Sequence, residues 1–276
     1  MSNASYTYTQ VKNGTGSFKY ESPIVYSSGV LTLQQRLNAI GYNLTEDGKF
    51  GSGTKTAVTN FQNECNLSTD GVAGKNTLTQ LDKVYQSNYF TNYGKPISTS
   101  EWGRSNILAG NFNDIDLLAR IIWGEERAIN DAQVAVAKVI KNRSTTSGYY
   151  ASSSSYPNAS IWARVVGKPS HYATAEEAIC CTPKRGDSSR SDGINVYWKK
   201  AVDLAASLVN GTSFTVPLGY TVGSDENVSS TKTTRVTTQL NQTAASLFKE
   251  NLAAGKVKGT VVTYKSTLTG NVFYTM

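Results

Sequence analysis

Residues 114–143 read DIDLLARIIWGEERAINDAQVAVAKVIKNR, and their apolar side chains recur with the period of an α-helix. The first apolar face consists of Leu117, Leu118, Ile121 and Ile122. Continuing this face by one turn reaches Glu125, so the pattern places a carboxylic acid in line with a stripe that we expect to be buried. Apolar surroundings favour the protonated form of a carboxyl group, and a general acid working near neutral pH must be protonated. Glu125 is therefore a candidate general acid.

The neighbours of Glu125 add to this hypothesis. Trp123 and Gly124 precede it, and we expect the missing side chain of Gly124 to let a large substrate approach the helix. We expect Glu126 to face water or Arg127, because it lies on the shoulder of the same helix. A glutamate at the edge of an apolar stripe is also a common helix-end residue that reaches solvent, so the local pattern leaves both interpretations open.

Residues 117–143 resemble the opening of the spore-cortex-lytic and cell-wall hydrolase family typified by SleB. That family has an apolar helix ending in Gly-Glu, a short spacer, Gln-Val-Ala-Val-Ala, an apolar step and Asn-Arg. The matching positions here are Gly124-Glu125, residues 133–137, Val139-Ile140 and Asn142-Arg143. The resemblance implies a fold and chemistry similar to those of lytic transglycosylases, and it implies that the catalytic residue is Glu125.

Two further segments resemble the same family. Residues 165–172 (VVGKPSHY) resemble a segment that ends in Gln and an aromatic residue, with His171 in the place of Gln. Residues 270–274 (GNVFY) resemble the closing segment of the family. The family's Tyr-Asn-Pro element is not visible in the unusually long stretch 183–259, where residues 219–221 (GYT) are its candidate substitute. The substrate-binding residues that we expect from this resemblance are His171, Tyr172, Tyr220, Phe273 and Tyr274.

A second pattern lies upstream, where residues 47–54 (DGKFGSGT) recur in similar form 23 residues later as residues 70–77 (DGVAGKNT). In each copy Asp-Gly predicts a tight turn, and a second glycine precedes a helix. Together with an apolar face that includes Leu33, the repeat predicts a compact helical unit over residues 29–84. This stretch resembles the three-helix peptidoglycan-binding domain found beside many cell-wall lytic enzymes, which implies peptidoglycan as the partner.

These patterns divide the chain into four parts. We expect an N-terminal arm, a peptidoglycan-binding domain, a linker and a catalytic domain, over residues 1–28, 29–84, 85–112 and 113–276. The expected fold class is mainly α. In detail, we expect a small helical domain followed by an α+β, lysozyme-like domain similar to those of lytic transglycosylases.

Composition limits the partners. The chain of 276 residues has a formal net charge of +7, which favours a polyanionic partner such as a cell-wall polymer, although such a charge also serves solubility. The Lys and Arg residues are scattered, and no run of 18 apolar residues occurs, so we expect neither a nucleic-acid nor a membrane partner. We expect the protein to be a monomer.

The first ten residues, MSNASYTYTQ, lack the basic and apolar regions of a signal peptide. We therefore expect either a secreted mature form or a phage lysin that is released at lysis. In both cases the expected place of action is the bacterial cell wall or the spore cortex, and vegetative peptidoglycan and cortex both fit as substrates.

The residue inventory also limits the chemistry. A zinc hydrolase normally needs two or three His ligands, and the chain has one His, so we expect no metal site and no cofactor. A Cys–His peptidase could pair His171 with Cys180 or Cys181. A phage or spore protein that binds the wall without cleaving it is a further alternative.

Within glycan cleavage, the number of carboxylates separates two mechanisms. Hydrolysis by a muramidase or glucosaminidase needs a second carboxylate, for which the candidates are Asp131, Glu176 and Asp187. A lytic transglycosylase needs only one, which protonates the leaving oxygen and then accepts the proton of the 6-hydroxyl as a 1,6-anhydro ring closes. Because none of the three candidates lies in a recognisable pattern, we expect the lytic reaction between MurNAc and GlcNAc.

Overall fold

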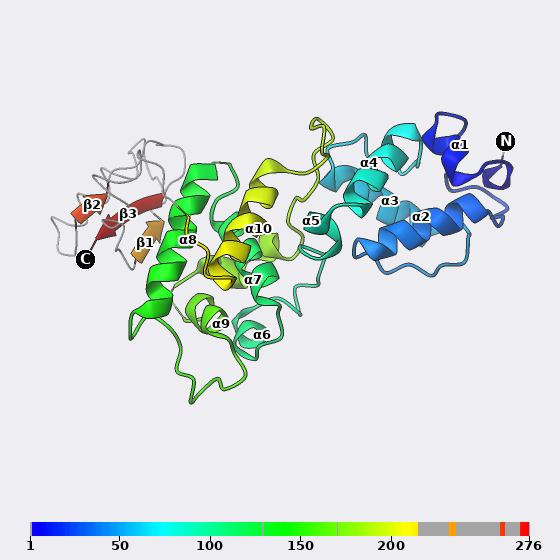
Figure 1. The fold of residues 1–276 in the computed structure, drawn as a ribbon. Helices are drawn as coiled ribbons and strands as arrows, with labels where there is room; N and C mark the ends of the chain where they lie inside the picture. Colours follow the sequence, from blue (N-terminus) through cyan, green and yellow to red (C-terminus); the bar gives the residue numbers. More distant parts are fainter. Residues whose placement is uncertain are drawn as a thin grey trace, which may run out of the picture. The chain divides into compact units, whose positions relative to one another are not determined.

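The computed structural model describes residues 2–128, 130–169 and 171–214, together with strands at 232–235, 260–262 and 271–275 (Figure 1). It is mainly helical, as the sequence predicts. The chain divides into two compact units. Unit 1 comprises Met1–Pro96 and Thr182–Lys199, and unit 2 comprises Ile97–Cys181 and Lys200–Met276. Each unit is therefore built from two separate stretches of sequence.

Unit 1 consists of short helices around one apolar core. Its elements are η1 (Asn3–Ser5), α1 (Tyr8–Lys12), α2 (Ser28–Ala39), α3 (Ser52–Glu64), α4 (Lys75–Tyr85) and α5 (Asn88–Thr91). Helix α1 packs against both α2 and α4. Its Tyr8 side chain is buried in the same core as Leu33 of α2 and Phe61 of α3. The segment expected as an N-terminal arm thus supplies part of the core of this unit.

The first Asp-Gly turn of the repeat is held by one buried amide from α2. Gln34 Nε2 donates to Asp47 Oδ1 at 2.9 Å and to the Lys49 carbonyl at 3.1 Å. Gln34 Oε1 in turn accepts from the backbone N–H of Gly48 at 2.8 Å. Gly48 has a φ of +67°, which a residue without a Cβ adopts at little cost. A single side chain therefore bonds to three successive residues of the turn.

Helix α3 repeats this arrangement in the second copy. Gln62 Nε2 donates to Asp70 Oδ1 at 2.8 Å and to the Val72 carbonyl at 3.0 Å. Gln62 Oε1 accepts from the Gly71 N–H at 2.9 Å. The repeat of residues is therefore also a repeat of hydrogen bonds, in which each helix carries the Gln that orders the turn after it.

A third Asp-Gly turn comes from far downstream, in the segment Thr182–Lys199. Gly193 has a φ of +70°, and the Ile194 N–H donates to Asp192 Oδ1 at 3.2 Å. Gln80 of α4 donates to the Gly193 carbonyl at 2.8 Å. Helix α10 (Val196–Val209) begins three residues after Gly193. Each of the helices α2, α3 and α4 thus carries a Gln that is bonded to an Asp-Gly turn.

The same downstream segment is anchored in unit 1 by a buried guanidinium group. Arg185 Nε donates to Glu64 Oε1 at 2.6 Å, and the two side chains are 0% and 4% exposed. Other N–H groups of Arg185 donate to the main-chain carbonyls of Ile40, Phe90 and Tyr93. Because the buried cation has both a carboxylate and carbonyl partners, residues 182–199 form an integral part of the core of unit 1.

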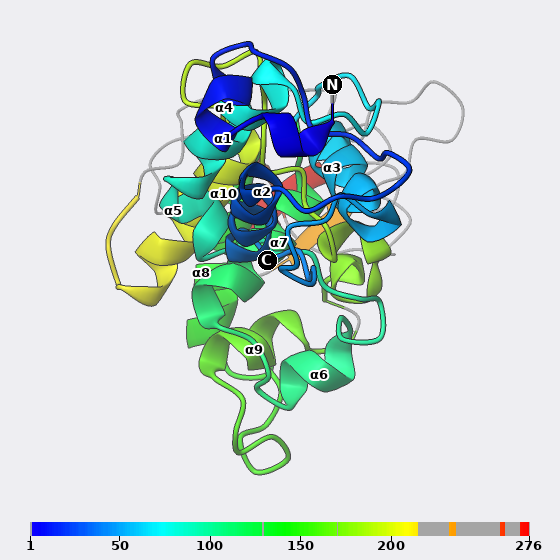
Figure 2. The ribbon, with the colours of Figure 1, turned by 90° about the vertical axis from the view of Figure 1, so that its right-hand side faces the viewer.

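Unit 2 surrounds one buried helix. Its helical elements are α6 (Arg104–Leu108), α7 (Asp114–Glu125), α8 (Asn130–Thr145), α9 (Ile161–Val166), η2 (Ala173–Glu176), η3 (Ala178–Cys180) and the later part of α10. Helix α7 contacts α8, α9, η2 and η3, and α6 lies beside α9 (Figures 1 and 2). Asn113 caps α7 by accepting from the Ile115 N–H at 3.0 Å. Asp114 and Asp116 in the first turn interact favourably with the helix dipole.

The described strands form one antiparallel sheet. The strands are β1 (Lys232–Arg235), β2 (Thr260–Val262) and β3 (Asn271–Thr275). Their order is β1-β3-β2, with Thr233 of β1 opposite Phe273 of β3. Strands are a small fraction of the described residues, so the mainly α fold class is confirmed. Within the same residues, no helix is both long enough and apolar enough to cross a membrane.

Candidate active site

Helix α7 ends at Glu125, the residue predicted to be catalytic. The eight residues before it, 117–124, are all buried, so the helix is enclosed on every side and not only along one stripe. Glu125 itself is half-buried. Its Oε1 accepts a hydrogen bond from Thr174 Oγ1 at 2.7 Å. The carboxylate therefore lies at the end of a buried helix, with one oxygen oriented by a neighbouring hydroxyl.

Gly124 has a packing role that differs from the one expected. A Cβ at this position would lie 2.6 Å from Cys180 Sγ and 3.1 Å from Thr174 Cγ2. The space beside Gly124 is therefore filled by η2 and η3 and is not open to a substrate. The missing side chain instead lets η2 approach α7 closely enough for Thr174 to reach Glu125.

Glu126 does not face water, contrary to our expectation. It is 5% exposed and ends the helix as its C-cap. Its Oε1 accepts from the Ala128 N–H at 2.8 Å, and its carbonyl accepts from Gln133 Nε2 at 2.8 Å. Gln133, the first residue of the Gln-Val-Ala-Val-Ala pattern, is fully buried and links the start of α8 to the end of α7.

Arg120 is a buried charge that the sequence reasoning missed. It lies on α7 and is 1% exposed. Its guanidinium group pairs with Asp116 Oδ2 at 2.9 Å and donates to the carbonyls of Cys180 at 2.7 Å and Cys181 at 3.1 Å. The signal that could have found it is a charged residue inside an apolar helix, since such a residue needs partners from elsewhere in the fold.

Tyr172 is buried and precedes Thr174, the hydrogen-bond partner of Glu125, by two residues. The pKa of Tyr172 is raised to about 12, mainly by burial, with Arg143 acting to lower it and Glu125 acting to raise it. Arg143 Cζ lies 4.9 Å from the centre of the Tyr172 ring. The phenol therefore stays protonated at neutral pH.

His171 directly precedes Tyr172 in the sequence. Its ring centre lies 6.0 Å from that of Tyr149 and 6.4 Å from that of Tyr172. The pKa of His171 is lowered to about 4, first by burial and then by the positive charges of Arg143 and Lys168. The imidazole is therefore neutral over the physiological pH range.

The structure brings together only part of the predicted set. Tyr172 follows His171 and precedes Thr174, which bonds to Glu125, by two residues, and the rings of His171 and Tyr172 lie 6.4 Å apart. Tyr220 lies outside the described residues. Phe273 and Tyr274 belong to β3, of which the structure describes the backbone alone.

The three candidate second carboxylates differ in their surroundings. Glu176 is exposed, and its Oε1 lies 3.2 Å from Arg104 Nε. Asp187 belongs to unit 1, whereas Glu125 belongs to unit 2. The side chain of Asp131 is not among those that the structure describes. None of these observations adds a second carboxylate to the group around Glu125.

The two adjacent thiols are buried and reduced. Cys180 Sγ donates to the Arg120 carbonyl at 3.4 Å, and Cys181 Sγ donates to the Ser98 carbonyl at 3.8 Å. Burial raises the pKa of both thiols above the usual range, so the nucleophilic thiolate form is disfavoured. Among the described residues, no three His, Cys, Asp or Glu side chains are grouped as a metal site.

Comparison with known proteins relates the chain to two groups. Residues 26–81 match the family model described as "Putative peptidoglycan binding domain". The spore cortex-lytic enzyme of Oceanobacillus iheyensis is 33% identical over 174 residues, covering 49% of this chain and 62% of that enzyme. The spore cortex-lytic enzyme of Bacillus cereus is 35% identical over 171 residues, covering 56% of this chain and 62% of that enzyme.

A shorter match is to the zinc D-Ala-D-Ala carboxypeptidase of Streptomyces albus G, which is 40% identical over 65 residues, 22% of this chain and 24% of that protein. No solved structure matches the chain. The chain spans 62% of the length of the spore cortex-lytic relatives. The two family resemblances predicted from the sequence are confirmed by these matches.

Proposed function

We propose that this chain, a homologue of spore cortex-lytic enzymes that carries a peptidoglycan-binding domain, degrades peptidoglycan with Glu125 as its catalytic residue. The observation that carries the proposal is the position of Glu125 at the end of a buried helix, hydrogen-bonded to Thr174. We assign catalysis to unit 2, as a lysozyme-like domain, and wall binding to unit 1, which contains residues 29–84.

The reaction that we assign is lytic cleavage between N-acetylmuramic acid and N-acetylglucosamine. Protonated Glu125 donates its proton to the glycosidic oxygen while the bond from that oxygen to C1 breaks. The resulting carboxylate accepts the proton of the C6 hydroxyl, whose oxygen bonds to C1 and closes a 1,6-anhydro ring. Glu125 ends the cycle protonated, and no water is consumed.

Hydrolysis is the alternative within the same site. It requires a second carboxylate about 5–10 Å from the first, as nucleophile or as base for a water molecule. Glu176 is engaged by Arg104, and Asp187 belongs to unit 1, so neither supports this mechanism. A Cys–His peptidase is disfavoured because burial keeps the Cys180 thiol protonated.

Wall binding in this proposal comes from unit 1. The net charge of +7 attracts the enzyme to anionic cell-wall polymers over a distance of about 10 Å at moderate salt. The enzyme acts as a monomer, without a cofactor, at the bacterial cell wall or the spore cortex. The lactam-containing cortex and vegetative peptidoglycan are the two substrates to compare.

Product analysis tests the reaction. Purified vegetative sacculi and spore cortex are digested with the full chain in water enriched in heavy oxygen, and the soluble fragments are identified by mass spectrometry. The lytic reaction gives 1,6-anhydro ends without label, because no water enters the product. A labelled reducing end would instead establish hydrolysis, and the absence of released fragments from both substrates would contradict the enzymatic proposal.

A further inference from the structure

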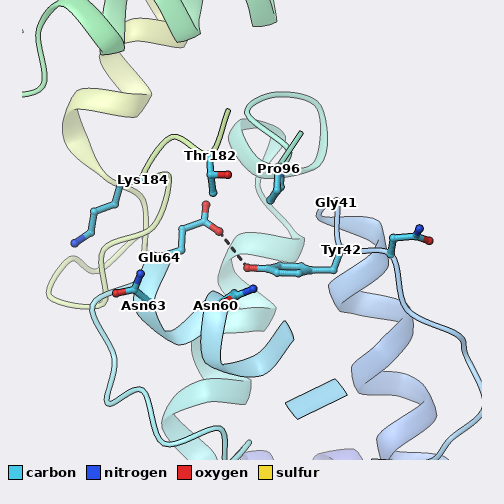
Figure 3. A pocket seen from close by; sticks show the side chains of 9 residues that line it. Gly41, Tyr42, Asn60, Asn63, Glu64, Pro96, Thr182 and Lys184 are labelled. Carbon is cyan, nitrogen blue, oxygen red and sulfur yellow. Dashed lines mark hydrogen bonds between the residues drawn. The ribbon is translucent and has the colours of Figure 1, made fainter. Parts of the chain in front are cut away.

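A polar pocket lies on unit 1, which contains none of the residues assigned to catalysis. Its volume is about 520 Å³. It is lined by Tyr42 after α2, by Asn60, Asn63 and Glu64 of α3, and by Thr182 and Lys184 of the downstream segment. Figure 3 shows Thr182 and Pro96 on one side of the Tyr42 ring, and Asn60 and Asn63 on the other. The pocket is therefore enclosed jointly by the helical repeat and by residues that follow it in the chain by more than a hundred positions.

The floor of the pocket has no unbalanced charge. Glu64 is paired with Arg185, at 2.6 Å from Nε and 3.4 Å from Nη2. Tyr42 Oη donates to Glu64 Oε2 at 3.3 Å. Burial, and secondarily the charge of Glu64, raises the pKa of the Tyr42 hydroxyl, which therefore remains a donor. The Glu64 carboxylate is thus neutralised by Arg185 and accepts a hydrogen bond from the Tyr42 hydroxyl.

The rim of the pocket offers neutral hydrogen-bonding groups. Asn60 and Asn63 lie one turn apart on α3 and are exposed. Within the described part of the chain, neither amide side chain makes a hydrogen bond. Each amide can donate and accept, so both are available to a ligand. The cation at the rim, Lys184, contacts the Asn66 side chain.

These features fit an uncharged polar ligand with an apolar face. A pyranose ring that carries an acetamido group has both properties, because its C–H face packs on an aromatic ring while its hydroxyls and amide bond to side-chain amides. The pocket volume lies within the range of small-ligand sites, about 300–1,000 Å³. A peptide with several carboxylates would need several cations, and Lys184 is the one cation among the residues that line this pocket.

We propose that this pocket binds an N-acetylated amino sugar of the peptidoglycan glycan strand. The proposal rests on the proposed function, since it specifies where and by what chemistry unit 1 holds the wall. It adds that the site is completed by Thr182 and Lys184, which lie outside the residues 26–81 that match the peptidoglycan-binding model. Residues of the downstream segment therefore contribute to wall recognition.

The test measures binding of the full chain to intact sacculi and to sacculi stripped of their stem peptides by an amidase. Sedimentation on ice gives the affinity for both materials. The main variant is Asn60→Ala/Asn63→Ala, which removes two exposed amides and keeps the core. Asn76→Ala, on the exposed surface of α4 and outside the pocket, is the matched control. Thr182→Ala tests the downstream wall of the pocket, and thermal melting verifies that each variant is folded.

We expect the wild type to bind both kinds of sacculi with similar affinity. The double variant is expected to bind both about tenfold or more weakly, because the two side-chain amides that bond to the ligand are lost. Thr182→Ala is expected to weaken binding several-fold, and Asn76→Ala is expected to change nothing. Fragment release by Asn76→Ala, which lies outside the pocket, should match that of the wild type.

Two results would overturn the proposal that this pocket binds an amino sugar. If the double variant binds as tightly as the wild type, the pocket is not the site. If the wild type binds intact sacculi but not stripped sacculi, the ligand is the stem peptide and the sugar assignment is wrong. In either case, continued release of glycan fragments would leave the proposed enzymatic function standing. Loss of fragment release in the wild type itself would count against that function and not specifically against the pocket.

Discussion

The Asp-Gly turns of unit 1 and the carboxylate site of unit 2 depend on the sequence over different distances. Gln34 and Gln62 bond to Asp residues 13 and 8 positions away. The hydroxyl that orients Glu125 comes from Thr174, 49 positions away. Short-range chemistry repeats visibly along a sequence, whereas a contact between distant segments leaves no local pattern. The turns could therefore be predicted in some detail, and the surroundings of Glu125 could not.

Unit 1 also contains both kinds of contact. Its third Asp-Gly turn uses the same dipeptide as the first two, yet Gln80 and Gly193 are 113 positions apart. Arg185 and Glu64 are 121 positions apart. The stability of a small domain that resembles a known module can thus depend on a distant segment, and this difference is open to measurement.

Arg185→Leu is expected to have the largest effect on stability. The substitution leaves Glu64 buried without its cation, and breaking a buried pair in this way typically costs about 3–5 kcal/mol. Urea unfolding of the full chain measures the loss. Arg190→Leu is the matched control, because Arg190 pairs with Asp192 at 3.2 Å but is 39% exposed. The control is expected to cost about 1 kcal/mol or less. Equal losses in the two variants would show that the downstream segment does not anchor unit 1.

Two glycines give a second contrast, one in each unit. Gly124→Ala places a Cβ 2.6 Å from Cys180 Sγ, and overpacking of this kind costs about 1–3 kcal/mol. Gly53→Ala, in the first turn of α3, meets nothing within 4 Å and is expected to be neutral or to stabilise by up to about 1 kcal/mol. Thermal unfolding of both variants measures the difference. A harmless Gly124→Ala would contradict the close packing of η3 on α7.

The smallest expected effect concerns the pH dependence of stability. Because the pKa of His171 is lowered to about 4 in the folded chain from its usual 6.5, the unfolded chain binds a proton in this interval and the folded chain does not. The His171 contribution is therefore fully present above pH 6.5 and is lost as the pH falls toward 4. His171→Gln removes this titration. The melting temperature of the variant minus that of the wild type is therefore expected to be higher at pH 5 than at pH 7.5. A difference that is the same at both pH values would contradict this environment for His171.

Local patterns in the sequence predict much of the fold. The second glycine of each repeat copy precedes a helix, and α3 and α4 begin directly after Gly51 and Gly74. The apolar period around Leu117 predicts α7, and the Glu after Gly124 ends it. These successes share one cause, since caps, turns and helix faces are set by residues within a few positions of one another.

The environment of the candidate site could be predicted only in part. Glu126 was expected to face water but is buried, because Ala128 and Gln133 fold back on it beyond the end of the helix. Gly124 was expected to admit a substrate but instead admits Cys180. Periodicity describes one helix at a time and contains no information on what packs at its end. The role of Glu125 stays a prediction, and its hydrogen bond with Thr174 is the contact that the structure adds to it.

The most direct test of the account is the activity of Glu125→Gln on purified sacculi. The substitution keeps the shape and can still accept a hydrogen bond from Thr174, but it cannot donate or accept the catalytic proton. Turnover is expected to fall about 10²–10⁴-fold, as is typical of the loss of acid–base catalysis, while binding to sacculi is retained. Glu101→Gln, which alters an exposed carboxylate that caps a turn at Ser98, is the matched control and is expected to keep full activity. A Glu125→Gln variant that releases glycan fragments at the wild-type rate would contradict the assignment.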